Sequence, residues 1–136
     1  MKKCGELTDE DYVALADFRH ALRSFQAFSE VKATEVGLTP QQHQALLAIR
    51  AASPGEVTVG TIAERLILKP HSATGLVDRL EALDLVTRHE ASTDRRRAVL
   101  RLTAKAETLL AKLSTTHREE IGRLKPLLAD LMARLG

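Results

Sequence analysis

The stretch from Thr58 to Thr103 constrains the fold more than any other part of the sequence. It contains two short helical patterns separated by the three residues Ile67 to Lys69, and two short β-capable segments follow. The residues between those segments are polar and charged, which is typical of the tip of a two-stranded hairpin. Two helices joined by so short a turn are typical of a helix-turn-helix. The stretch therefore predicts a helix-turn-helix followed by a β-hairpin.

Threonines and prolines place the ends of the predicted elements. Thr39 to Gln42 form a capping box with proline at the first helical position. Pro70 opens the helix that follows the tight turn. Three further helix caps are predicted at Thr8, Thr58 and Thr103. The predicted strands are Leu85 to His89 and Val99 to Leu102.

The composition favours helices around a single core. Hydrophobic residues make up 44% of the 136 residues, and only 3% are aromatic, so Leu and Ala supply most of the apolar mass. A chain of this length is expected to form one domain. The predicted fold class is mainly α with a small β-hairpin wing. We place a winged helix-turn-helix core at residues 39–103, flanked by helices at 8–34 and 104–136.

The two terminal helices carry apolar stripes for which the small core offers no obvious partner. The N-terminal stripe consists of Leu15, Phe18, Leu22 and Phe25. Helical spacing of apolar residues also continues from Leu124 to Leu135, where Pro126 predicts a break or kink. The simplest partner for both stripes is the same region of a second chain, so we predict a homodimer.

Polar and basic side chains gather on the outer face of the helix that starts at Pro70. They are Lys69 at the N-cap position, then His71, Ser72, Thr74 and Arg79. Small polar side chains near a helix N-terminus can contact base edges, while the amide groups there meet phosphates. Lys69 is a poor N-cap, because its charge opposes the positive end of the helix. A nearby phosphate would offset that cost, so the pattern indicates contact with duplex DNA.

The predicted hairpin tip is basic. Between Leu85 and Arg101 there are five arginines and only two acids, and Arg95, Arg96 and Arg97 are adjacent. Asp94 lies two residues before Arg96 and can hold its guanidinium in one pose. A narrow minor groove attracts an arginine presented in this way. We therefore predict that the tip contacts DNA.

Three motifs resemble the MarR family of winged-helix transcription regulators. They are Thr61-Ile62-Ala63-Glu64-Arg65-Leu66, Leu76-Val77-Asp78-Arg79-Leu80-Glu81, and the run from Asp94 to Thr103. The last is similar to the family's wing signature, Asp-x-Arg followed by an apolar strand and Leu-Thr. The resemblance covers nearly the whole chain in element order.

The resemblance implies a homodimer joined by its terminal helices, with the fourth helix in the major groove and the wing in the minor groove of double-stranded DNA. It implies a repressor of transcription, often of its own operon, that releases DNA when a small molecule binds or on oxidation. The family's wing arginine corresponds to Arg96 and its orienting partner to Asp94. The recognition-helix contacts correspond to His71, Ser72 and Thr74, and further to Arg79.

The chain departs from the family pattern at four positions. Ile67 stands where the family commonly has glycine in the turn, and Lys69 replaces the usual small N-cap. Gly75 stands where a longer polar residue is common. Asp84 replaces the glycine that usually ends the recognition helix, and aspartate adopts the left-handed conformation more readily than most residues.

The sequence argues against several other classes of protein. The five histidines are scattered, and there is no His-x-x-x-His, no cysteine pair, no phosphate-binding glycine loop and no nucleophile elbow. We therefore predict no enzyme activity, no metal and no cofactor. No apolar run is long enough to span a membrane. A single cysteine, Cys4, and an N-terminus without a signal-peptide pattern indicate a cytoplasmic protein.

Four further interpretations stay open. In the first, the chain is a winged-helix module that binds another protein and not DNA, although three adjacent arginines argue against this. Alternatively, the regulator senses oxidation through Cys4, or a metal through Glu30, His43 and His117. By analogy with the family, His20, Arg23 and His43 are weak candidates for an effector site.

Overall fold

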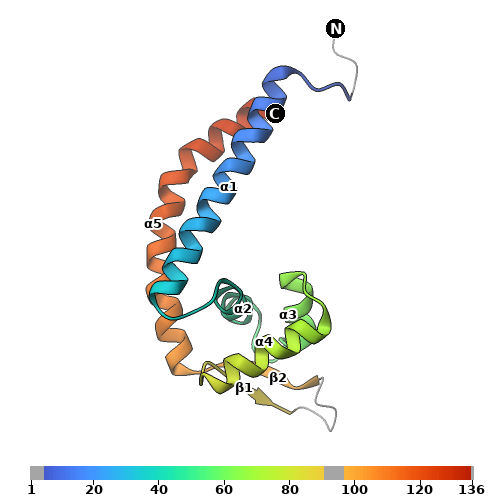
Figure 1. Ribbon diagram of the computed structural model, residues 1–136, viewed down its shortest axis with the longest axis vertical. Helices are drawn as coiled ribbons and strands as arrows, with labels where there is room; N and C mark the ends of the chain where they lie inside the picture. The colour runs from blue at the N-terminus through green and yellow to red at the C-terminus, as the bar shows by residue number, and fades with distance from the viewer. Residues whose placement is uncertain (1–4, 91–96, 136) are drawn as a thin grey trace. The chain divides into compact units, whose positions relative to one another are not determined.

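The computed structural model describes residues 5–90 and 97–135 of the chain. In order, the described elements are α1 (Asp9–Glu35), α2 (Pro40–Ala51), α3 (Val59–Leu66), α4 (Pro70–Ala82), β1 (Val86–His89), β2 (Val99–Leu102) and α5 (Ala104–Leu135) (Figure 1). The predicted fold class, mainly α with a small hairpin, is confirmed. The predicted first strand is one residue too long at its start, because β1 begins at Val86.

Two compact units divide the described chain. One consists of the described residues of Met1–Val31 and Thr115–Gly136, and the other of Lys32–Ser114. Both long helices, α1 and α5, therefore contribute to both units. The beginning of α5 packs within the second unit, where Ala106, Leu110 and Leu113 join the hydrophobic core. No helix in the described residues is long and apolar enough to cross a membrane.

Helix caps in the second unit follow the prediction from the sequence. Thr39 and Gln42 form a reciprocal capping box at the start of α2. Thr58 caps α3, where the reciprocal partner is Thr61. At the start of α5 the Thr103 hydroxyl accepts from the Ala106 amide at 3.2 Å. Lys69 stands at the N-cap of α4 and makes no side-chain cap bond, as its side chain has no acceptor atom.

One face of α4 fills the centre of the second unit. Ala73, Leu76, Val77 and Leu80 are at most 2% exposed and pack with residues from α2, α3 and the hairpin. In the sequence, Leu83 continues the helical spacing of these four residues, but it is 43% exposed. The reason is that α4 ends at Ala82, so the side chain of Leu83 no longer follows the helical period that buries its predecessors.

Backbone hydrogen bonds attach the hairpin to the helical core. β1 and β2 are antiparallel, with Val86 opposite Leu102 and His89 opposite Val99. The Leu100 amide donates to the Val57 carbonyl at 2.8 Å, just before α3. The Thr103 amide donates to the Leu85 carbonyl at 3.1 Å. The base of the wing is therefore bonded to the same unit that holds α4.

Two residues other than glycine adopt the left-handed conformation, and each ends a helix of the core. Asp84 has φ 60° beyond α4, in agreement with the conformation predicted for it. Ile67 ends α3 with φ 55° and ψ 52°, and its amide donates to carbonyls of Ala63 and Glu64. The Ile67 side chain is 92% exposed. A β-branched residue in this conformation is strained, and here burial does not offset the strain.

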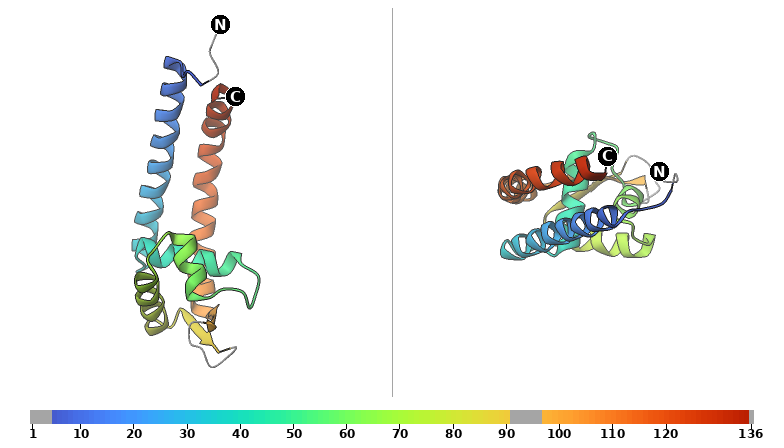
Figure 2. Two further views of the ribbon diagram at one scale, coloured as in Figure 1. Left: turned by 90° about the vertical axis from the view of Figure 1, so that its right-hand side faces the viewer. Right: turned by 90° about the horizontal axis from the view of Figure 1, so that it is seen from above.

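Helices α1 and α5 run antiparallel within the first unit (Figure 2). Arg134 near the end of α5 pairs with Asp17 near the start of α1 at 3.5 Å, while His117 meets Ser29 near the end of α1 at 2.8 Å. α5 continues as one helix through Pro126, so of the predicted break or kink the break does not occur, and the kink stays a prediction. Leu131, beyond the proline, is fully buried.

The strain at Ile67 gives a first prediction. Ile67→Gly removes the cost of a left-handed β-branched residue, about 1 kcal/mol or more, and loses almost no buried surface. We expect a higher melting temperature by a few degrees, measured by circular dichroism. The matched control is Asp84→Gly at the other left-handed position, which should gain less because aspartate tolerates this conformation. A larger gain at Asp84 than at Ile67 would contradict the strain argument.

Candidate nucleic-acid interface

The outer face of α4 carries most of the side chains predicted to contact a nucleic acid. Lys69 is exposed at the N-cap, and exposed positions along α4 include His71, Ser72, Thr74 and Arg79. Gly75, on the same side, is half-buried. The opposite face of the helix is packed in the core, so this polar surface is held on a rigid element.

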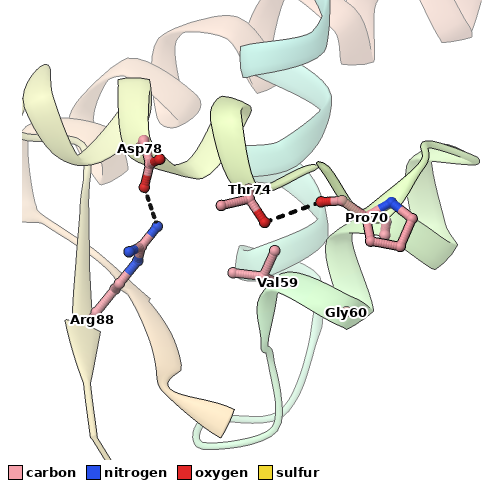
Figure 3. A pocket seen from close by; sticks show the side chains of 7 residues that line it. Val59, Gly60, Pro70, Thr74, Asp78 and Arg88 are labelled. Atoms are coloured by element: carbon pink, nitrogen blue, oxygen red, sulfur yellow. Dashed lines mark hydrogen bonds and ion pairs between the residues drawn. The ribbon is translucent and has the colours of Figure 1, made fainter. Parts of the chain in front are cut away.

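Two of the outward side chains of α4 are engaged within the protein. The Thr74 hydroxyl donates to the Pro70 carbonyl at 3.0 Å, one turn back along the helix (Figure 3). A guanidinium nitrogen of Arg88, on β1, donates to the Asp78 carboxylate at 2.6 Å. Thr74 and Asp78 are four residues apart and lie on one stripe of the helix. On this stripe, the Thr74 hydroxyl proton and one Asp78 oxygen are therefore occupied.

Arg88 connects the wing to the recognition helix, and it was not among the residues singled out from the sequence. Besides Asp78 it approaches Glu81 of α4 at 4.0 Å, and its side chain is only 18% exposed. Asp78 and Glu81 are three residues apart, so they lie on neighbouring positions of the helix surface. That spacing of acids was visible in the sequence. The partner was not, because the ion pair depends on how β1 lies against α4.

A second stripe of α4 has no partner inside the described part of the chain. The side chains of His71, Ser72 and Arg79 make no hydrogen bond or ion pair there, and neither does that of Lys69 before the helix. His71, Gly75 and Arg79 are spaced four residues apart, and Ser72 is adjacent, so they share one face. This face presents several hydrogen-bond donors with no acceptor group opposite them.

A cavity of about 560 Å³ lies between α3, α4 and β1. Its wall is apolar at Val59, Ala63 and Pro70, and polar at Thr74, Asp78 and Arg88 (Figure 3). The paired stripe of α4 therefore forms one side of this cavity. The unpaired stripe, with His71, Ser72 and Arg79, does not line it.

Most of the predicted wing contacts lie outside the described residues. Asp94, Arg95 and Arg96 fall in the interval 91–96, and of these wing residues the structure describes only Arg97, which is exposed two residues before β2. Cys4 is also outside the described residues. The roles predicted for these residues therefore stay predictions.

The candidates for effector or metal binding occupy different environments. His43 is 1% exposed in α2, whereas His20 and Arg23 are exposed on α1. His117 is 9% exposed, bonds to Ser29, and meets the rings of Phe25 and Phe28 edge-on at 5.8 Å. Within residues 5–90 and 97–135, no group of three or more His, Cys, Asp or Glu side chains is arranged to hold a metal ion.

Comparison with known proteins agrees with this architecture. The MarR family model matches residues 36–97. A Bacillus subtilis protein described as the uncharacterized HTH-type transcriptional regulator YsmB is 26% identical over 117 residues, covering 83% of this chain and 79% of that protein.

Two solved structures from Staphylococcus aureus share the fold. A point mutant of MepR bound to an oligodeoxyribonucleotide has a TM-score of 0.69 at 22% identity, covering 96% of this chain and all of that chain. MarR in complex with salicylate and kanamycin has a TM-score of 0.67 at 20% identity, covering 85% of this chain and 73% of the other. The family match falls on the winged helix-turn-helix core, so residues 36–97 of the chain are similar to the MarR family in both sequence and fold.

Proposed function

We propose that the protein represses transcription by binding double-stranded DNA as a homodimer, with α4 of each subunit in the major groove and the wing in the minor groove. The observation that carries this proposal is the unpaired stripe of α4. It combines exposed donors with a helix whose other face is fixed in the core. The MepR mutant of the same fold is bound to an oligodeoxyribonucleotide, which supports the same partner here. Such a regulator acts in the cytoplasm, where its DNA lies.

Charge supports a phosphate-rich partner. The net charge of the chain is +2, which is modest, but Lys69 and Arg79 on the α4 side and the run Arg95 to Arg97 in the wing concentrate cations in the winged segment. The amide groups at the start of α4 add a partial positive charge beside Lys69. Phosphate oxygens would stabilise both, which accounts for a lysine at an N-cap position.

Exposed apolar side chains on the first unit support the homodimer. They are Tyr12, Val13, Leu15, Leu22 and Val31 on α1, and Ile121, Leu127, Met132 and Leu135 on α5. Leu15 and Leu22 belong to the predicted N-terminal stripe, whereas Phe18 and Phe25 are half-buried. Burial of these side chains against another surface would be favourable. A second copy offers the same apolar surface in return.

We also propose that a small molecule controls DNA binding. The S. aureus MarR of the same fold was solved with salicylate and kanamycin, which supports an effector of low molecular weight. The cavity of about 560 Å³ beside α4 has the size of a typical ligand pocket. His20, Arg23 and His43 remain the candidates proposed from the sequence. In this proposal Cys4 is not the sensor, so Cys4→Ser should leave any response to peroxide unchanged.

DNA binding should depend on salt and on the wing. Arg96→Ala should weaken binding by about 1–3 kcal/mol per site, because it removes a groove contact and a positive charge. Asp94→Ala should weaken it less, since only the orienting partner is lost. Fluorescence anisotropy on one operator duplex, repeated from low to physiological salt, measures both effects. Affinity that does not change with salt would indicate a partner other than nucleic acid.

The homodimer can be tested by placing a charge on the exposed apolar surface. Met132 is 71% exposed in the chain by itself, so Met132→Glu should leave the fold intact but disfavour a contact that buries this position. Light scattering should show a dimer for the wild type and a shift toward monomer for the variant. Ile67→Glu is the matched control, because Ile67 is also apolar and exposed, at 92%, but belongs to the other unit. A monomeric, well-folded wild type would contradict the proposal.

A further inference from the structure

Gly75 lies in the interior of α4, where the packing of the chain does not require a glycine. A Cβ built at this position meets only a guanidinium nitrogen of Arg79 within 4 Å, at 4.0 Å, which is an ordinary contact with the end of a flexible side chain. Its φ is not in the left-handed region. Glycine inside a helix costs about 1 kcal/mol relative to alanine. Alanine would therefore fit and would stabilise the helix, so packing within the described chain does not account for the glycine.

Arg79 extends over the space that Gly75 leaves open. The two residues are one helical turn apart, and side chains on a helix lean toward its N-terminus. The distance of 4.0 Å between the Arg79 guanidinium and a Cβ at position 75 places the charged group beside the middle of the helix. This guanidinium has no hydrogen-bond or ion-pair partner within the described chain.

The neighbouring stripe of α4 does not offer a comparable group of donors. The Thr74 hydroxyl proton is held by the Pro70 carbonyl, and the Asp78 carboxylate accepts from Arg88. The Thr74 hydroxyl oxygen can still accept a hydrogen bond, and its methyl group can make an apolar contact, but its hydroxyl proton is already donated to Pro70. Arg79 keeps all five of its donors, arranged in a planar fork.

We propose that Arg79 reads a guanine in each half-site, and that Gly75 is the gap through which its guanidinium reaches the base edge. Guanine presents two acceptors in the major groove, O6 and N7, and their spacing matches the fork of an arginine. A side chain at position 75 would occupy the surface over which the guanidinium lies. This inference rests on the proposed function, because it names the base that the proposed major-groove helix recognises.

The test replaces guanines of a selected operator, one at a time, by 7-deazaguanine, which lacks the N7 acceptor and keeps the other atoms of the base edge. For the wild type, one symmetric pair of guanines should be sensitive to this change. Arg79→Ala should lose about 5- to 150-fold in affinity per half-site of the unmodified operator, the range of one bidentate contact, and more for the dimer on both half-sites. The variant should also become insensitive to the modification at that pair.

Arg50→Ala is the matched control, since it removes one exposed arginine of the same unit that does not belong to α4. It should keep the full sensitivity to 7-deazaguanine, whatever its effect on affinity. Arg79→Ala could instead lower affinity by the same factor, relative to wild type, on the modified and the unmodified operator. The variant would then still distinguish the sensitive guanine pair. In that case Arg79 contacts phosphate and the inference is overturned.

A second variant tests the role of the gap. Gly75→Leu introduces a good helix former, so the melting temperature should hold or rise, while the discrimination between guanine and 7-deazaguanine should be lost. Retained discrimination with a stable fold would overturn the role of Gly75. A wild type that binds no DNA at all would remove the proposed function and this inference together. A wild type that binds an operator without a sensitive guanine would remove this inference alone.

Discussion

The one-sided burial of α4 is the constraint on which the rest of the winged core depends. Ala73, Leu76, Val77 and Leu80 point into the core and are at most 2% exposed. Full burial of a side chain such as Leu or Val stabilises a fold by about 1.5–3 kcal/mol. The helix therefore cannot rotate about its axis without exposing this face. Because the buried face is fixed, the opposite face is presented in a single orientation, which is what a helix that reads DNA requires.

Residues that disfavour local structure lie within this helix and in the turn before it. Ile67 is strained and exposed in the turn, Lys69 leaves the N-terminus of α4 without a side-chain cap, and Gly75 weakens the helix interior. None of the three is explained by packing within the described chain. Local costs of this kind are expected where a surface is shaped by a partner. A DNA backbone beside Lys69 and a base edge beside Gly75 would account for two of them, and Ile67 has no explanation in these contacts.

The sequence allowed the element order, the capping threonines and the left-handed Asp84 to be predicted, because each depends on a few adjacent residues. The exposure of Leu83 and the continuity of α5 through Pro126 could not be predicted in this way, since helical periodicity alone does not show where α4 ends or whether α5 runs on past a proline. The Arg88–Asp78 ion pair was missed for a related reason. It joins a strand to a helix, and its residues meet only once the chain has folded. The engagement of the Thr74 hydroxyl with Pro70 likewise depends on a rotamer that the sequence does not specify.

The central claim is that two copies of α4, held on rigid cores, read one DNA site together. Selection of duplexes from a random pool by the purified protein, followed by hydroxyl-radical footprinting of the selected site, tests it most directly. The account predicts an imperfect palindrome whose half-sites are centred roughly 10 base pairs, one helical turn, apart, with matching protection on both halves. Selection of no common sequence, or a single asymmetric footprint, would contradict it.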